Sequence, residues 1–140
     1  MEKKYDIESC KYQVGDQGPA GGVIVLVMDY QKYGWRYAEA APKCIAKLNW
    51  DDAKRLCCEE THWGFNDWDL PDKDSLVSLL RIRHPGDCVD YYAPGYHWTN
   101  ERGLALTFWG PTGYWGNTAG HFQECNPASL CAVRPVRKFL

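Results

Sequence analysis

The chain has 140 residues, enough for one domain, and its 16 Lys and Arg against 18 Asp and Glu give a formal net charge of −2. This balance provides neither the basic field typical of nucleic-acid binding nor an acidic tail, so no nucleic-acid partner is expected. Residues 1–13 carry charge but no apolar run, and no window approaches the roughly 20 apolar residues of a membrane helix, so neither a signal peptide nor membrane insertion is expected.

The seven cysteines leave the cellular compartment open. They are more than a reduced cytosolic domain needs, yet their odd number leaves at least one thiol unpaired. As written, the chain suits a virion or cytoplasmic protein. It suits a cell-surface or secreted protein if an export signal has been removed.

The first predicted element follows a glycine-rich segment, because residues 14–29 read VGDQGPAGGVIVLVMD. A P-loop would continue with Lys-Ser or Lys-Thr and a helix, and a dinucleotide fingerprint would place its glycines between a strand and a helix. Here the glycines come before the apolar run. They therefore predict turns that lead into a strand over Val23–Met28, buried on both faces.

A second strand is predicted over Gly34–Ala40, and Ala41-Pro42 ends it. One face would carry Trp35, Tyr37 and Glu39, and the other Arg36, Ala38 and Ala40. The segment WDDAKRLCCEE then predicts a helix over residues 50–60, because Asn49 can cap it and acidic residues occupy its first turn. The spacing of its apolar residues directs one side to the core, namely Trp50, Ala53 and Cys57.

A second helix is predicted after Leu70-Pro71, with Asp72 as its cap and an end before the sequence HPG at residues 84–86. Its apolar stripe comprises Leu76, Val77, Leu79 and Leu80.

Residues 88–126 show little periodicity and much Gly, Pro, Asn and aromatic residue. They predict a long loop region braced by short strands over 96–99, 105–109 and 121–123. Residues 131–139 predict one last strand, in which Pro135 requires an edge position or a bulge.

Six blocks of the chain carry a family resemblance. In order they are VGDQGPAGG with its strand, GWRYAEAAP, the helix with Trp50 and Ala53, DWDLPDKDSL, Tyr96-His97-Trp98, and VRPVRKF. Over Val14 to Phe139 they resemble the Lcl C-terminal domain family, a branch of the C-type-lectin-like fold, although Asp69 stands where the family usually has Arg. Some members are adhesins that bind sulfated glycans, so the resemblance implies a binding module.

The resemblance also implies an architecture. We expect an α+β chain with a C-type-lectin-like fold, in which two helices pack on a small antiparallel sheet and the N- and C-terminal strands are paired. Residues 1–140 would form a single domain, with 1–13 as an N-terminal extension and 88–126 as the long loop region. Lectin-like folds commonly tie the first helix to the last strand. Here that implies a disulfide from Cys57 or Cys58 to Cys131, with Cys88 and Cys125 as a loop staple, while free buried cysteines remain the alternative.

The chain has the residue types that bind calcium in lectins, but not in the order of the lectin motifs. Lectins of this fold bind calcium through a Glu-Pro-Asn or Gln-Pro-Asp loop and a Trp-Asn-Asp strand, whereas this chain has ECNP at 124–127 and NDW at 66–68. The nearby aspartates are expected to form turns and helix caps. Three Cys/His pairs share a four-residue spacing, which would suit zinc on a helix. No Cys-x-x-Cys is present, however, so no metal or other cofactor is expected. The pairs are Cys58 with His62, His84 with Cys88, and His121 with Cys125.

An enzyme is not expected, because no motif assembles a nucleophile with a base. Cys125 and Cys131 are similar in kind to the cysteine pair of the formylglycine-generating oxidase, which is built on a related fold. Their spacing differs, the surrounding motif is absent, and the chain is about half the length that such an enzyme needs.

The loop region is the expected binding face, because aromatic rings beside amides and charges suit a sugar or a protein surface. Trp98 and Trp109 are assigned to the core. We expect a non-catalytic recognition domain, with a structural or receptor-binding display domain of a bacteriophage or surface assembly as the alternative. The candidate ligand-binding residues are Tyr91, Tyr92, Asn100, Glu101, Arg102, Tyr114, Trp115, Asn117, His121 and Asn126.

Overall fold

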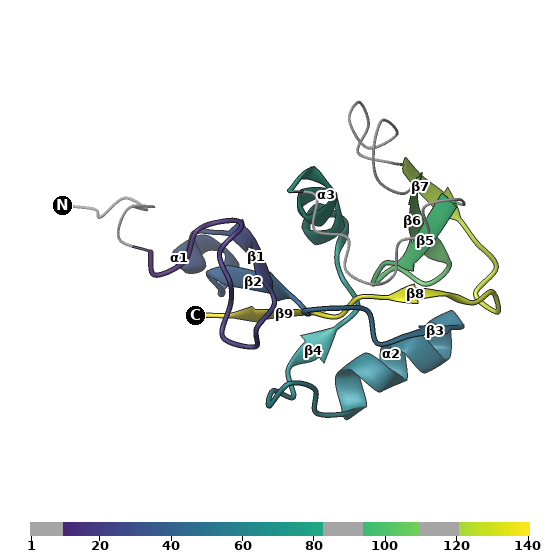
Figure 1. Cartoon of the computed structure of the whole chain (residues 1–140), viewed down its shortest axis with the longest axis horizontal. Helices are drawn as coiled ribbons and strands as arrows, with labels where there is room; N and C mark the ends of the chain where they lie inside the picture. The colour runs from purple at the N-terminus through teal and green to yellow at the C-terminus, as the bar shows by residue number, and fades with distance from the viewer. Residues whose placement is uncertain (1–9, 83–93, 110–120) are drawn as a thin grey trace.

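The computed structural model describes residues 10–82, 94–109 and 121–140 (Figure 1). Its elements in chain order are β1 (Val23–Val27), α1 (Tyr30–Tyr33), β2 (Tyr37–Ala40), β3 (Ala46–Leu48), α2 (Trp50–Glu59), β4 (Trp68–Asp69), α3 (Lys73–Arg81), β5 (Pro94–Trp98), β6 (Leu104–Trp109), β7 (His121–Glu124), β8 (Cys131–Val133) and β9 (Val136–Phe139). The α+β class expected from the sequence is confirmed.

The described strands form two sheets. One has the order β1-β2-β9-β4 and is antiparallel, and the other has the order β3-β8-β5-β6-β7. In the second sheet β5 and β8 are parallel, with His97 opposite Ala132, while its other pairs are antiparallel. The expectation of one small antiparallel sheet is therefore corrected to two sheets, of which the larger is mixed.

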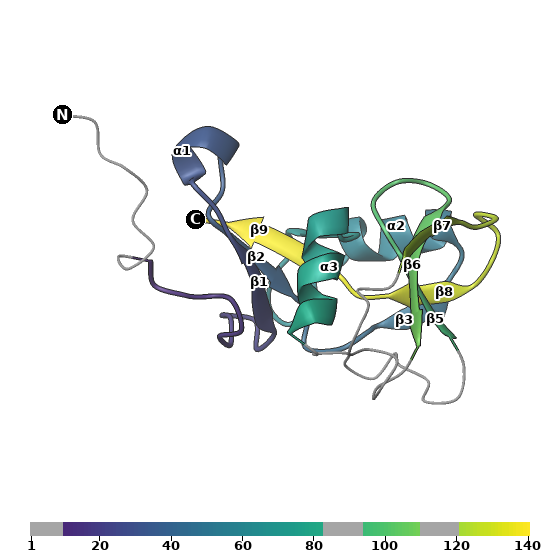
Figure 2. The same ribbon diagram turned by 90° about the horizontal axis from the view of Figure 1, so that it is seen from above.

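The C-terminal segment differs from the single strand that was predicted. It forms two strands that run end to end along the molecule, β8 in one sheet and β9 in the other (Figures 1 and 2). The break falls at Arg134 and Pro135, where proline cannot donate a ladder hydrogen bond, and the Pro135 carbonyl accepts from the Ala41 amide at 2.8 Å. The N- and C-terminal strands share a sheet but are not paired, because β2 lies between β1 and β9.

The glycine-rich segment before β1 surrounds a carboxylate that belongs to the chain itself. The amides of Ala20 and Gly22 each donate to Glu39 Oε2 at 2.9 Å, and Glu39 is fully buried. A Cβ on Gly18 would lie 2.4 Å from Glu39 Cδ, so only glycine fits there. The segment thus forms turns ahead of a strand, as predicted, and its amides bind an internal anion.

The two predicted helices are confirmed. The Asn49 side chain caps α2 by accepting from the Asp52 amide at 2.9 Å, and Ala53 and Cys57 are buried. Asp72 bonds Ser75 at the start of α3, with 2.7 Å between Asp72 Oδ1 and Ser75 Oγ. The sequence did not predict α1, a single turn between β1 and β2 that is too short to show helical spacing. None of the described helices is long and apolar enough to cross a membrane.

The core lies on both sides of the long β8–β9 axis. α3 packs on β1 and β2 through Leu76 and Leu79, while α2 lies beside β3 and β4 (Figure 2). Trp98 is fully buried in the second cluster, as expected, and its Nε1 donates to the Leu48 carbonyl at 2.7 Å. The α2 side of the molecule is therefore fixed by apolar packing and by a directed bond.

None of the disulfides implied by the resemblance is present, because Cys57, Cys58, Cys125 and Cys131 are free thiols. Cys57 and Cys131 are buried in the α2 cluster among apolar side chains, and their burial raises the pKa of both thiols to about 12. Cys58 is exposed and donates to Asp69 at 3.3 Å. Cys44, for which no bond was expected, is disulfide-bonded.

Candidate functional site

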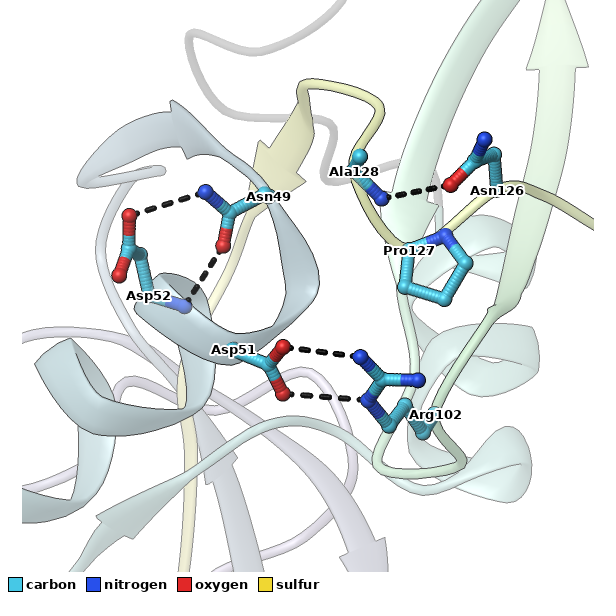
Figure 3. Close-up of a pocket in the computed structure, with 7 residues that line it drawn as sticks. All are labelled: Asn49, Asp51, Asp52, Arg102, Asn126, Pro127 and Ala128. Carbon is cyan, nitrogen blue, oxygen red and sulfur yellow. Dashed lines mark hydrogen bonds and ion pairs between the residues drawn. The ribbon is translucent and has the colours of Figure 1, made fainter.

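A polar pocket of about 570 Å³ opens where three segments meet (Figure 3). The segments are the start of α2, the turn between β5 and β6, and the loop between β7 and β8. The residues that line the pocket are Asn49, Asp51, Asp52, Arg102, Asn126, Pro127 and Ala128.

Backbone contacts join these segments. The amide of Trp50 donates to the Pro127 carbonyl at 2.8 Å, and the Trp50 indole Nε1 donates to the Thr99 carbonyl at 2.9 Å. One residue at the start of α2 therefore bonds to both of the other segments. In addition, the Cys125 amide donates to the Gly103 carbonyl at 2.8 Å, which ties the two loops to each other. The pocket walls are thus positioned by main-chain bonds rather than by side chains alone.

The β5–β6 turn has a conformation that requires glycine at one position. Gly103 has a φ of +81°, and a Cβ there would lie 3.3 Å from the Cys125 carbonyl oxygen. The Thr99 hydroxyl stabilises the same turn, because it donates to the Leu104 carbonyl at 2.8 Å and accepts from the Glu101 amide at 3.1 Å. This geometry places Arg102 at the tip of the turn, facing α2 (Figure 3).

Arg102 and Asp51 form a two-bond ion pair on one wall of the pocket (Figure 3). Arg102 Nε lies 3.1 Å from Asp51 Oδ1, and Arg102 Nη2 lies 2.9 Å from Asp51 Oδ2. The hydrogen bonds from Arg102 lower the pKa of Asp51, and the same bonds raise the pKa of Arg102. Both side chains remain 57% exposed, so the pair presents a charged donor and a charged acceptor to any ligand that enters.

Two side-chain amides complete the polar lining. Asn49 both accepts from the Asp52 amide and donates its Nδ2 to Asp52 Oδ2, each at 2.9 Å. The Asn126 side-chain oxygen accepts from the Ala128 amide at 2.9 Å, which leaves its Nδ2 group on the exposed side of the loop (Figure 3). The ring of Pro127 lies between Asn126 and Arg102 and adds an apolar surface. The pocket therefore combines donors, acceptors and a short apolar wall.

The structure brings together part of the set that was predicted from the sequence. Arg102 and Asn126 line the pocket, and Asn100 and Glu101 lie in the same exposed turn, with Glu101 Oε1 3.4 Å from Lys73 Nζ. The backbone of His121 begins β7. Five predicted residues lie outside the described part of the chain: Tyr91, Tyr92, Tyr114, Trp115 and Asn117.

Five lining residues were missed as ligand-binding candidates. Asn49, Asp51 and Asp52 were assigned to the cap and the positive end of α2, and the structure confirms the Asn49 cap. The missing information was that the loop at Pro127 and Ala128 folds against that end of the helix. A proline next to Asn126 was the only local signal for it.

The aspartates between Asn66 and Asp74 that were read as turns and caps are engaged by cations or by the backbone. Asp67 Oδ1 accepts from Arg137 Nε at 2.7 Å, and Asp69 Oδ1 accepts from Lys54 Nζ at 2.7 Å. Asp72 caps α3 and lies 3.3 Å from Lys138 Nζ. Over the described ranges, His, Cys, Asp and Glu side chains form no group of three or more that could hold a metal ion.

Replacing Asn49 with alanine is expected to lower the free energy of unfolding by about 1 kcal/mol, because the Asp52 amide loses its cap. Urea denaturation of the two proteins measures this loss. Asn49→Ser is the matched comparison, since the serine hydroxyl can accept the same bond and should retain most of the stability. Equal losses in both variants would contradict the capping role.

No protein-family model matches the chain, and no curated protein matches it.

Proposed function

We propose that this chain is a non-catalytic recognition domain with a C-type-lectin-like fold, and that it binds a glycan in the pocket between α2 and the two loops. The observation that carries the proposal is the Arg102–Asp51 pair, a charged donor and a charged acceptor side by side in an open pocket of about 570 Å³. Sugar hydroxyls both donate and accept, so such a pair can bind adjacent hydroxyls of one ring.

The rest of the lining supports a sugar over a purely apolar ligand. The side-chain amides of Asn49 and Asn126 offer further polar contacts, and the Pro127 ring offers a surface for the C–H face of a sugar. The walls are joined by the bonds from the Trp50 amide and the Trp50 indole to the two loops, so a ligand would not have to order them. An open, preformed pocket with this lining suits selective binding of a sugar with moderate affinity.

The arrangement of elements supports the lectin-like part of the proposal. Strands from both ends of the described chain lie in one sheet, and α2 and α3 come in chain order between β2 of that sheet and the β5–β6 hairpin of the second sheet, which carries Arg102. The segments that line the pocket are the start of α2 and the β5–β6 and β7–β8 connections, and they lie at the end of the molecule away from the C-terminus (Figure 1). This is the general placement of a ligand site on loops supported by a rigid scaffold.

A glycan array probed with the purified chain tests the proposal, first in calcium and then in a chelator. We expect binding that survives the chelator, because the Asp51 carboxylate is already paired with the Arg102 guanidinium and protein groups alone can contact the hydroxyls. Binding that is lost with calcium would contradict this binding mode. A blank array would contradict glycan recognition and favour protein recognition or a display role.

Two matched arginine variants locate the site. Arg102→Gln is expected to weaken glycan binding at least tenfold, since it removes the donor at the pocket wall. Arg55→Gln is the control, because Arg55 lies on α2 with similar exposure and pairs with Asp52 at 3.0 Å but does not line the pocket. Both ion pairs are exposed and screened by solvent, so both variants should remain folded and close to the parent in stability. Equal binding by the two variants would place the site elsewhere.

A further inference from the structure

A second pocket, of about 510 Å³, is lined by residues of β2 and β9 among others. These strands lie at the opposite end of the molecule from β5 and β6 (Figures 1 and 2). The lining of this pocket combines aromatic rings with positive charge. The residues that matter for its chemistry are Lys11, Tyr12, Arg36, Phe65, Arg137 and Phe139.

One wall is a stack of rings around a buried guanidinium. The Arg137 guanidinium carbon lies 3.8 Å from the centre of the Phe65 ring and 4.3 Å from that of Phe139. Arg137 is only 6% exposed by its side chain, and its Nε and Nη1 bond to Asp67 and Glu39. The arginine therefore holds the two rings in place, and the carboxylates of Asp67 and Glu39 balance its charge.

A second ring surface adjoins this wall. Tyr12 meets Tyr37 edge-on, with 5.2 Å between ring centres, and meets Phe139 at 6.2 Å. The Tyr37 hydroxyl accepts from the Lys11 amide at 2.7 Å, which fixes the backbone next to Tyr12. The pocket thus has rigid aromatic faces that a flat apolar group can contact.

Two cationic residues, Lys11 and Arg36, also line the pocket. Lys11 Nζ lies 5.3 Å from the Tyr12 ring centre, and Arg36 is positioned by the Tyr30 ring at 5.1 Å and by Cys10 Sγ at 2.9 Å. Among the described side chains that line the pocket, none is that of Asp or Glu, and Leu140 also belongs to the lining. A ligand that places an anionic group at Lys11 and a ring against Tyr12 and Phe139 would match both halves of the lining.

We propose that this second pocket binds an aromatic carboxylate, with the ring against Tyr12 and Phe139 and the carboxylate at Lys11 and Arg36. The same chemistry occurs in a small aromatic acid and in the free C-terminal phenylalanine of a peptide. The site is independent of the glycan pocket, since it shares no lining residue with it.

Amide NMR titration of the whole chain with 3-phenylpropionate tests the proposal. We expect saturable shifts confined to β2, β9 and the residues around Tyr12, and at least tenfold weaker binding of the neutral analogue 3-phenylpropan-1-ol. Equal binding of acid and alcohol, or the absence of localised shifts, would overturn it. A second titration with the peptide Gly-Ser-Gly-Phe identifies the source: tighter binding than the free acid indicates a protein terminus, and weaker binding indicates a small molecule.

A pair of lysine variants provides the control. Lys11→Gln is expected to weaken 3-phenylpropionate binding at least threefold. Lys32→Gln removes a lysine with the same 5.3 Å placement over a tyrosine ring, Tyr33, but outside the pocket, and should leave binding within a factor of 1.5. Both positions are on the surface, so both variants should fold. Equal effects of the two substitutions would contradict the assignment of the carboxylate to Lys11.

Discussion

Glu39→Gln is expected to lower the free energy of unfolding by about 3–5 kcal/mol, because it removes one partner of a buried ion pair. Glu39 is fully buried, and its two oxygens bond to three donors: the amides of Ala20 and Gly22, and Arg137 Nη1 at 3.1 Å. Glutamine has the same shape, but its NH₂ group would face a donor, and the Arg137 charge would lose its buried partner.

The other carboxylate on the same arginine supplies the control. Asp67 bonds Arg137 Nε at 2.7 Å, but its side chain is 42% exposed, so water can replace it when it is changed. Asp67→Asn should therefore cost about 1 kcal/mol or less. Urea denaturation followed by tryptophan fluorescence gives both values from the unfolding midpoints. Similar losses in the two variants would show that burial of Glu39 is not what makes its bonds important.

The turns before β1 depend on the same carboxylate. Gly22 sits where a Cβ would lie 1.9 Å from the Ala40 carbonyl oxygen, and Gly18 sits against the Glu39 side chain. The sequence predicted turn glycines, since the neighbours that a phosphate loop requires are absent. It could not predict their ligand, because Glu39 was expected on one face of a strand with Trp35 and Tyr37, and nothing local indicates that all four residues of β2 are buried.

Local signals predicted the longer elements well. Asn49 before a run with 3.6-residue spacing was sufficient for α2, and Leu70-Pro71 followed by Asp72 was sufficient for α3. The elements that were missed are the one-turn α1 and the strands β3 and β4, of three and two residues. Elements this short are specified by their partners in the fold, so no period in the sequence marks them.

The candidate site was predictable only in part, for a related reason. Arg102 and Asn126 were selected because they are polar residues in a turn-rich region, and that logic requires no knowledge of the fold. Asp51 was interpreted as an acidic residue that stabilises the positive end of the α2 dipole. It faces Arg102 because the β5–β6 turn folds back onto α2. The disulfide predictions came from analogy and failed, because Cys57 and Cys131 lie in the same buried cluster but as free thiols.

The folded chain is expected to lose stability steeply in acid through His97. This residue is 1% exposed in the middle of the second sheet, paired with Leu106 on β6 and Ala132 on β8. Desolvation, together with the charges of Arg134 and Lys47, lowers its pKa from 6.5 to about 3. The imidazole therefore stays neutral in the fold at pH values where the unfolded chain protonates it.

The direction of this change in stability with pH follows from the number of protons that each state binds. Between pH 6.5 and about 3 the unfolded state binds one more proton than the folded state at this residue, so stability falls as the pH falls. The slope is about 1.4 kcal/mol per pH unit well inside this window, and the loss between pH 6.5 and 4.5 is roughly 2.3 kcal/mol, because the unfolded-state imidazole is only half protonated at pH 6.5. Above about pH 7.5 the contribution is constant.

A pair of variants separates this effect from the carboxylates that also titrate in acid. His97→Gln is expected to be less stable than the parent chain at pH 7, yet its further loss on going to pH 4.5 should be smaller by about 2–3 kcal/mol, because no imidazole is left to protonate. Leu106→Ala damages the same packing but retains His97, so it should keep the parent's full loss in acid. Urea midpoints at the two pH values measure both differences. If His97→Gln and Leu106→Ala lost the same stability in acid, the neutral buried imidazole would not be the source of the pH dependence.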